Sequence, residues 1–381
     1  MGKNCQISRR NFMKCGAIVA GGLAAGLDVA RAGPTSNRNI LNYNENMDYR
    51  RLGKTGLMVS AACLGGHWKR IHTVVTSASP KSACCDDADT ANLSNPEFVK
   101  NRHEVVSHCI ESGINYVDAC SPQEILAYSK ALKGRREKMY LGYSWHTREP
   151  RYTEWRTPER LVQGLEDGLK EAGLDYIDVW RISLPMEGIA DLSELLRVEE
   201  ATVGALEKAK KQGKTRFTGV SSHNRVWLES VIEQYPKQIE IVLFPYTAKS
   251  KEMPEDSLFD TIRKQNVGVF GIKPFASNAL FEGDSSPNST HRAEDDRRAR
   301  LAIRYILSNP AITAPIPGMV SITQVDNVVK AIQERRQLDL KEKNQGKKPS
   351  ASLELELEPV ARQMWAKLPP DYQWLKQWEY V

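Results

Sequence analysis

The sequence has few cysteines for its length, and none of them are in the spacing typical of metal ligands. Only seven occur in 381 residues, five of them after residue 32, and there is no Cys-x-x-Cys pair. Zinc ribbons and iron–sulfur sites depend on such pairs, and a disulfide framework favours an even number. Cys84 and Cys85, followed by Asp86 and Asp87, could bind a metal, but we favour a polar loop with incidental cysteines. We therefore expect no metal site.

Long apolar runs and a strong charge imbalance are also missing. The chain carries 53 basic and 47 acidic side chains, a formal net charge of +6. The first 32 residues hold five of the basic side chains and one acidic one, so +2 remains for the rest. A charge this small and dispersed does not indicate nucleic acid or an anionic membrane as partner. With 41% hydrophobic residues, the composition is typical of a globular protein.

The N-terminal segment is where the basic excess lies. Residues 8–14 read Ser-Arg-Arg-Asn-Phe-Met-Lys and resemble a twin-arginine export signal. The Gly- and Ala-rich stretch that follows, 16–29, is shorter than the roughly 20 residues of a spanning helix, and residues 30–32 read Ala-Arg-Ala, a small-residue cleavage pattern. We expect 1–32 to be a signal peptide and the mature protein to be periplasmic without a membrane anchor. A disordered basic N-terminus is the alternative.

From about residue 48 to residue 338, short apolar runs alternate with amphipathic stretches in eight units. This pattern predicts a parallel sheet with crossover helices, and eight units over about 290 residues match a TIM (β/α)8 barrel. A doubly wound sheet would favour a Gly-rich phosphate turn after the first strand, which 65–67 is not. The expected strands are 61–65, 115–118, 139–143, 176–182, 216–221, 240–244, 267–272 and 312–316.

The predicted helices show the matching period. Leu161, Leu165 and Leu169 recur every four residues, and Gly173 is placed to end that helix in the left-handed conformation. The next helix is expected over about 198–211.

Three segments lie outside the repeat. We expect 33–47 to be a flexible linker, 67–97 a long polar first βα loop at the barrel face where active sites lie, and 339–381 a C-terminal extension. The extension begins with a lysine-rich stretch, continues as a short helix and becomes aromatic. Its aromatic density should make it dock on the barrel or on another chain, and we favour packing against an outer helix over a lid. The aromatic residues of the last 17 positions are Trp365, Tyr372, Trp374, Trp378 and Tyr380.

Residues 49–60 read as a hairpin that would close the amino-terminal end of the barrel, and they resemble the opening of aldo/keto reductases. The likeness continues in family order at 113–119, 174–178, 213–224, 273–274 and 315–319 with Gln324 and Asn327. This resemblance implies a TIM barrel that transfers hydride between NADP or NAD and a carbonyl or alcohol, without a metal.

The family resemblance also implies an Asp, a Tyr, a Lys and a His at the barrel mouth. The Tyr hydroxyl, with an ordinary pKa of about 10, gives its proton to the carbonyl oxygen with help from the Lys ammonium that the Asp holds. Asp118 matches its motif, but Gln123, Ser144 and Ser183 stand where the Tyr, Lys and His belong.

None of the three replacing side chains can donate a proton near neutral pH, and the missing Lys removes the local positive charge. Tyr143 and His146 are candidates for a relocated acid, and His67 and Tyr128 are further ones. Residues of these kinds are more often packed or surface residues, and that is the alternative for each.

The positions that bind the cofactor in the family match this sequence better than the catalytic positions do. Ser221 and Ser222 match the strand end that holds the carboxamide, and Tyr246 matches the ring that stacks on nicotinamide. Leu243 replaces a carboxamide-binding Gln, and no Lys or Arg lies between Gly318 and Gln324 to bind a 2′-phosphate, so NADP and NAD both stay open. The pyrophosphate loop runs from Lys273 to Ser277, and the adenosine end matches Gly318, Met319, Ser321, Gln324 and Asn327.

These features favour an exported aldo/keto reductase-like oxidoreductase with a degenerate tetrad and a small carbonyl or alcohol substrate. The alternative is a catalytically silent barrel that binds a ligand or a protein. A barrel hydrolase or isomerase is a distant third, because Asp118 and Glu124 are the only mouth carboxylates we find. The substrate and the oligomeric state are not readable from the sequence.

Overall fold

The computed structural model describes residues 40–75, 93–184, 189, 191–344 and 351–381. The expected signal peptide at 1–32, the Cys-Cys-Asp-Asp cluster at 84–87 and the end of the lysine-rich stretch lie outside these residues. Within them, no helix has the length and apolar character needed to cross a membrane.

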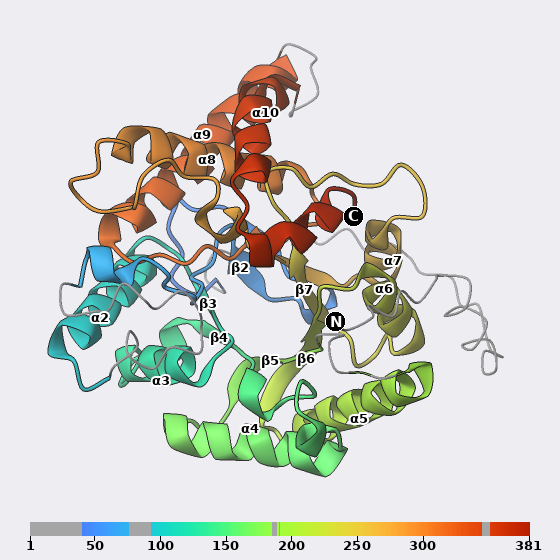
Figure 1. Ribbon diagram of the computed structural model, residues 1–381. Coiled ribbons are helices and arrows are strands. Elements are labelled where there is room, and N and C mark those ends of the chain that lie inside the picture. The colour runs from blue at the N-terminus through green and yellow to red at the C-terminus, as the bar shows by residue number, and fades with distance from the viewer. Residues whose placement is uncertain (1–39, 76–92, 185–188, 190, 345–350) are drawn as a thin grey trace.

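The framework is a curled sheet of seven parallel strands in sequence order, each paired with the next along the chain (Figure 1). This order, with helices outside, is that of the barrel predicted above, and the α/β barrel fold is confirmed. The strands are β3 (Tyr116–Ala119), β4 (Tyr140–Tyr143), β5 (Ile177–Ser183), β6 (Thr215–Ser221), β7 (Ile241–Pro245), β8 (Gly268–Ile272) and β9 (Ala314–Pro315).

The gap between β3 and β9 is closed by residues 63–65. Leu64 forms a parallel bridge with Val117, and Gly65 forms one with Gly318. The Cys63 amide donates to the Pro315 carbonyl at 3.1 Å. The expected first strand is therefore two isolated bridges, and these bridges complete the ring.

A hairpin of β1 (Tyr49–Arg51) and β2 (Met58–Ser60) precedes the barrel, as predicted. Its turn contains Gly56 with φ 73°, a left-handed conformation that glycine adopts without strain. The Lys54 amide donates to the Asn266 carbonyl just before β8, and Leu52 is fully buried. The hairpin thus covers the amino-terminal end of the barrel.

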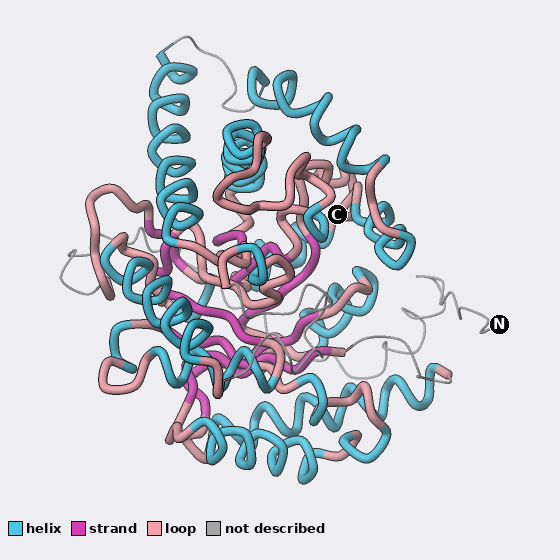
Figure 2. Tube along the Cα trace, turned by 60° about the vertical axis from the view of Figure 1, so that its left-hand side comes forward, coloured by secondary structure: helices cyan, strands magenta, loops and turns pink. Residues whose placement is uncertain are grey.

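The helices surround the strands, as the two views show (Figures 1 and 2). Side chains cap several of them, for example Thr157 before α4 and Asp191 before α5. Gly173 ends α4 with φ 65°, as predicted, whereas α5 starts before the expected residue because Asp191 caps it. The helices are α2 (Pro96–Glu111), α3 (Pro122–Ala131), α4 (Pro158–Ala172), α5 (Leu192–Lys211), α6 (Arg225–Gln234), α7 (Leu258–Gln265), α8 (Arg292–Ser308), α9 (Ile322–Asn344) and α10 (Ala351–Ala366). Short 3₁₀ segments are η2 (Gly53–Thr55), η3 (Ile71–Thr73), η4 (Arg136–Lys138), η5 (His146–Arg148), η6 (Thr153–Trp155), η7 (Ala276–Asn278) and η8 (Pro370–Trp378).

The C-terminal extension runs from α10, which packs on α8, into η8 near the middle of the molecule (red in Figure 1). Trp378 stacks on Phe244 of β7 with ring centroids 5.6 Å apart. The backbone of Tyr380 bridges to Lys251, in the loop after β7, and Val381 is fully buried. The expected docking is confirmed, and it extends from an outer helix to the barrel itself.

One buried carboxyl group in the helical layer makes stability depend on pH. Glu199 of α5 is fully buried and accepts a hydrogen bond from the Trp227 indole at 2.7 Å. Burial raises the pKa of Glu199 from 4.5 to about 7, although the Trp227 hydrogen bond opposes this. The folded chain therefore binds this proton more tightly than the unfolded chain, so stability falls as pH rises from 4.5 to 7.

We expect Glu199→Gln to increase the free energy of unfolding by about 3 kcal/mol at pH 8 and to change it little at pH 4, measured by urea denaturation. The amide keeps an acceptor for Trp227 without the charge. Glu200→Gln, at an exposed position on the same helix, is the control and should change little at either pH. An equal effect of Glu199→Gln at both pH values would contradict the assignment.

Candidate active site

The carboxyl ends of the strands open into a cavity of about 310 Å³, which we call the mouth cavity. Asp118 of β3, Ser183 of β5 and Ser221 of β6 line it, together with Ser144 directly after β4. Side chains from neighbouring parallel strands meet at this face of a barrel, which is where ligands bind.

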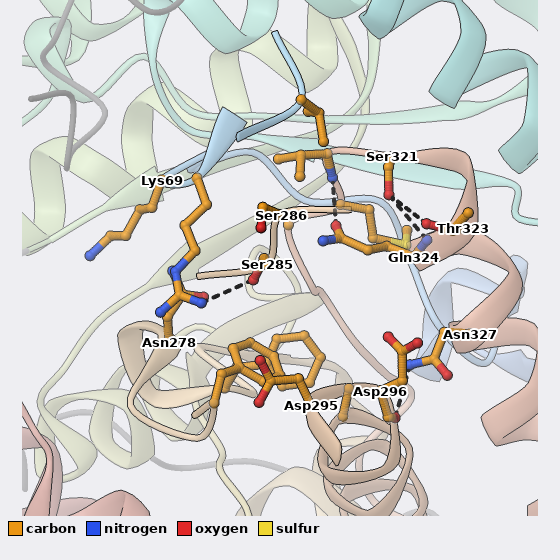
Figure 3. Close-up of a pocket in the computed structure, with 18 of the residues that line it drawn as sticks. Lys69, Asn278, Ser285, Ser286, Asp295, Asp296, Ser321, Thr323, Gln324 and Asn327 are labelled. Atoms are coloured by element: carbon orange, nitrogen blue, oxygen red, sulfur yellow. Dashed lines mark hydrogen bonds between the residues drawn. The ribbon is translucent and has the colours of Figure 1, made fainter. Parts of the chain in front are cut away.

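A second cavity of about 230 Å³, the side cavity, adjoins it between the first βα loop and the starts of α8 and α9 (Figure 3). Ser321, Gln324 and Asn327 lie on one side of this space, while Asn278 and Ser285 lie on the other. The two cavities share a wall, so an elongated ligand can extend from one to the other. The shared residues are His67, Lys69, Phe275, Asn278 and Gly318.

A buried ion pair crosses the floor of the mouth cavity. The Arg181 guanidinium of β5 donates to both Asp118 oxygens, at 2.5 and 3.2 Å, and both side chains are at most 6% exposed. Burial alone would lower the pKa of Arg181, but the Asp118 carboxylate outweighs it and raises that pKa. The expectation that the loss of Lys removes the local positive charge is therefore wrong, because Arg181 supplies a cation beside Asp118.

The two serines at the expected Lys and His positions meet at a third residue. The Ser144 hydroxyl and the Ser183 amide donate to one oxygen of Glu149, at 2.9 and 2.8 Å. The other oxygen of this buried carboxyl group has no hydrogen-bond partner among the described residues, and burial raises the pKa of Glu149. Glu149 lies in the loop after β4, where no sequence pattern marked it.

The expected Tyr position is not at the mouth. Gln123, at the start of α3, lines neither cavity, and its side-chain oxygen is buried without a partner in the described part of the chain. Its neighbour Glu124 lines the mouth cavity instead. A side chain that contacts the substrate carbonyl, as the family's Tyr does, must therefore come from another position.

Glu124 is part of a cluster with His67 and Cys120. The His67 Nδ1 lies 3.2 Å from a Glu124 oxygen and 3.4 Å from the Cys120 sulfur. The backbone amides of His67 and Cys120 donate to the two carboxylate oxygens at 2.5 and 2.8 Å. Burial would raise the pKa of Glu124, but His67 and these amides outweigh it and lower the pKa to about 2. Only a glycine fits at position 66, since a Cβ there would lie 2.0 Å from the Glu124 carboxyl carbon.

Of the two main candidates for a relocated acid, the structure brings one to the mouth. His146 lines the mouth cavity, with Nδ1 3.0 Å from the Cys120 carbonyl oxygen. Tyr143 points outward against α4, where a Cβ on Gly168 would lie 1.7 Å from its hydroxyl. Neighbouring residues of a strand point to opposite faces, so Tyr143 and Ser144 cannot both face the cavity.

Most of the expected cofactor residues lie along the two cavities, but two do not. The Ser222 hydroxyl donates to the Leu184 carbonyl at 2.9 Å, away from the cavities. The Tyr246 ring packs on Phe259 with centroids 5.8 Å apart and its hydroxyl faces Asn309, so it does not present a ring to the mouth. Lining the mouth cavity are Ser221, Lys273, Ser277 and Gly318. Lining the side cavity are Gly318, Met319, Ser321, Gln324 and Asn327.

The C-terminal segment η8 reaches the mouth cavity through Tyr372. Trp374 stacks on His223 with ring centroids 4.1 Å apart. Tyr372 lines the cavity, and its hydroxyl accepts a hydrogen bond from Lys69 at 3.0 Å. Burial would raise the pKa of Tyr372, but the Lys273 and Lys69 ammonium groups outweigh it and lower that pKa. The tail therefore packs on the outer helix α8, as we favoured, and in addition reaches the mouth.

Two arginines line the side cavity from positions that the motif search did not cover. Arg70, in the first βα loop, donates to the Ser285 hydroxyl at 3.0 Å, and Arg292 begins α8. Asp295 and Asp296 follow Arg292 on α8 and line the same cavity, with the Arg292 Nε 4.0 Å from an Asp296 oxygen. Guanidinium groups suit phosphate binding, so the side cavity holds candidates that the 318–324 segment lacks.

The chain is similar to known reductases. The profile of the Aldo/keto reductase family matches residues 94–347. L-galactose dehydrogenase of Arabidopsis thaliana is 25% identical over 345 residues, covering 84% of this chain and 97% of that protein. Aldo-keto reductase family 1 member C3 of Homo sapiens is 29% identical over 246 residues, 58% of this chain and 71% of that protein. The structure of aldo-keto reductase AKR11C1 from Bacillus halodurans in its holo form superposes with a TM-score of 0.53 at 23% identity, over 75% of this chain and 91% of that one.

Breaking the ion pair at the floor of the cavity should lower stability strongly. Removing one partner of a buried pair leaves an unpaired charge, so we expect Arg181→Met to lower the free energy of unfolding by about 3 kcal/mol in urea denaturation. Adding Asp118→Asn should recover part of this loss. The control is Arg362→Met, which removes an exposed pair with Glu358 and should cost under about 1 kcal/mol. Equal losses in both variants would contradict the role of burial.

Proposed function

Because the chain belongs to the aldo/keto reductase family, we propose that this oxidoreductase transfers hydride between a nicotinamide dinucleotide and a small carbonyl or alcohol substrate. The observation that carries the proposal is the pair of adjoining cavities at the carboxyl face of the barrel, which share a wall at Gly318 and Asn278. A dinucleotide has a nicotinamide end and an adenosine end joined by a pyrophosphate. The mouth cavity and the side cavity together offer room for both ends.

The backbone between the cavities fits a pyrophosphate. Lys273, Ala276, Ser277 and Asn278 all have positive φ, from 47° to 68°. The Ala276 N–H donates to the Lys273 carbonyl within this turn, and we propose that the backbone N–H groups of Ser277 and Asn278 contribute to a concave anion site. We place the pyrophosphate here, the nicotinamide end near Ser221 in the mouth cavity and the adenosine end in the side cavity. When bound, the dinucleotide would supply the hydride chemistry of the family.

The proton for the substrate oxygen comes from His146 in this proposal. His146 lines the mouth cavity, and imidazole is the side chain that most often serves as a general acid or base in enzymes. Arg181, fixed by Asp118, presents a cation in the same space and would orient the substrate oxygen. The tetrad is thus degenerate at Gln123, Ser144 and Ser183, with its roles taken by other residues.

The family is NADP(H)-dependent in general, and we propose NADP for this chain. Arg70 and Arg292 line the side cavity, where the 2′-phosphate of an adenosine end would lie. We further propose export by the twin-arginine route, supported by the pattern of residues 8–14. Export of a folded enzyme requires a tightly held cofactor, and the η8 cover over Lys273 and Ser277 favours retention.

The central test is whether the protein carries a dinucleotide. The protein is purified from its native compartment and denatured, and the supernatant is analysed by absorbance and mass spectrometry; NADPH and NADH are then titrated into emptied protein. Bound or binding dinucleotide is the expected result. An empty protein that binds neither would overturn the proposal, whereas binding without turnover of any carbonyl would favour the silent barrel.

The choice of dinucleotide can be tested at the side cavity. We expect Arg70→Ala to weaken NADPH binding about 10-fold and leave NADH binding nearly unchanged, because only the former carries the 2′-phosphate. Fluorescence titration measures both. Arg263→Ala on α7, outside both cavities, is the control and should alter neither affinity. Equal weakening of NADPH and NADH by Arg70→Ala would refute the phosphate role.

The proton donor can be tested at the mouth. We expect His146→Gln to lower kcat for reduction of 4-nitrobenzaldehyde at least about 100-fold with a small change in KM, and to remove the limb of the pH–rate profile that reports the acid. His103→Gln, at an exposed position on α2, is the matched control. An unchanged pH profile in His146→Gln would exclude this residue as the donor.

A further inference from the structure

Three side chains of the kinds that bind metal ions meet in the wall of the mouth cavity. They are His67 after the first barrel segment, Cys120 after β3, and Glu124 in the first turn of α3. One ligand atom from each lies within 4.8 Å of the others. No other such trio of His, Cys, Asp or Glu occurs in the described part of the chain.

The distances within this trio fit a tetrahedral ion. The His67 Nδ1 lies 3.2 Å from a Glu124 oxygen and 3.4 Å from the Cys120 sulfur. Zinc–nitrogen and zinc–oxygen bonds of about 2.0 Å and zinc–sulfur bonds of about 2.3 Å place tetrahedral ligands about 3.3 Å apart for N and O, and about 3.5 Å apart for N and S. Both distances from His67 therefore match those around a zinc ion, while the Cys120 sulfur and a Glu124 oxygen lie within 4.8 Å of each other and would have to close around it.

The surroundings hold the ligands in place. The amides of His67 and Cys120 each donate to one Glu124 oxygen and orient the carboxylate, while each oxygen retains a second lone pair for an ion. Gly66 gives this carboxylate room against the backbone. The Cys120 carbonyl oxygen lies 3.0 Å from the His146 ring, which links the trio to the proposed proton donor. Such second contacts are typical of built metal sites.

The trio faces the same space as the substrate. His67, Cys120 and Glu124 all line the mouth cavity, as Asp118 and Arg181 do. Three protein ligands with a fourth position open to a cavity are typical of catalytic zinc sites, whereas structural sites have four protein ligands. Sulfur and imidazole ligands favour Zn²⁺ over Mg²⁺ or Ca²⁺.

We propose that His67, Cys120 and Glu124 bind one Zn²⁺ ion whose fourth position opens into the mouth cavity. No motif marks this site, because Cys120 and Glu124 lie four residues apart where β3 leads into α3, whereas His67 lies 53 positions before Cys120. The binding of the ion stands on this geometry alone. Its role rests on the proposed function: the ion takes the carbonyl or alcohol oxygen of the substrate and polarises it as a Lewis acid, in place of the phenol missing at position 123.

The ion itself is tested without substrate or dinucleotide. Metal-free protein, prepared with a chelator, is titrated with Zn²⁺ by calorimetry and with Co²⁺ by absorbance. We expect one equivalent of each to bind, with cobalt giving the visible bands of a tetrahedral site and a thiolate-to-metal band in the near ultraviolet. Cys120→Ser should remove the thiolate band, and His67→Gln should weaken Zn²⁺ binding at least about 10-fold.

Control measurements distinguish a variant that does not fold from one that folds but does not bind Zn²⁺. His103→Gln on α2 should bind Zn²⁺ as the parent does, and circular dichroism checks each variant. Absence of stoichiometric Zn²⁺ binding by the parent, or a thiolate band that persists in Cys120→Ser, would overturn the site and leave a hydrogen-bonded trio. If Cys120→Ser does not fold, the His67→Gln affinity decides.

The site and the proposed function can fail separately. NADPH binding is measured on metal-free protein and Zn²⁺ binding on protein without dinucleotide. Zn²⁺ binding without NADPH binding would overturn the proposed function and retain the ion site. NADPH binding without Zn²⁺ binding would overturn the ion site and retain the proposed function. If both bind, restoring Zn²⁺ to metal-free enzyme should restore turnover of 4-nitrobenzaldehyde at least about 10-fold, and unchanged turnover would overturn the Lewis-acid role.

Discussion

The buried ion pair between Asp118 and Arg181 is the constraint on which the floor of the mouth cavity depends. Two charged groups withdrawn from water must stay together, because either one alone would leave an unpaired buried charge. The pair joins β3 to β5 across β4, and Gly142 of β4 lies beneath it: a Cβ there would lie 2.7 Å from an Asp118 oxygen. Ser144 and Ser183 line the same cavity and are held there by hydrogen bonds to Glu149.

Much of the fold was predictable because its signals are local. The strands β3 to β9, the hairpin and the end of α4 at Gly173 follow from periodicity and turn residues within a few positions of each other. The first strand was overestimated, since its hydrogen bonds to β3 and β9 are two isolated bridges. The start of α5 was predicted too late, because the helix begins directly after the capping residue Asp191 and the apolar pattern does not indicate a cap.

The site was less predictable because its contacts are long-range. Motif positions placed Ser221, Lys273 and Gly318 along the cavities, but alternation along β4 excluded Tyr143 in favour of Ser144. Arg181 lies in a mostly apolar strand, and its partner Asp118 is 63 positions away in the sequence, so the sequence does not show the pair. Glu149 lies in a loop, and the trio of His67, Cys120 and Glu124 combines two neighbouring residues of the β3–α3 junction with a distant one. Tertiary proximity of this kind has no local signature.

The cover formed by η8 has a consequence for how the protein is made. Lys69 and Tyr372 touch although they lie 303 positions apart, and every other residue that we place around the dinucleotide precedes Tyr372 in the chain. During synthesis the residues that line the two cavities therefore leave the ribosome before Tyr372 and Trp374 do. In the arrangement that we propose for the dinucleotide, the cover would be the last part of the site to form. A dinucleotide bound before that point would be enclosed by it.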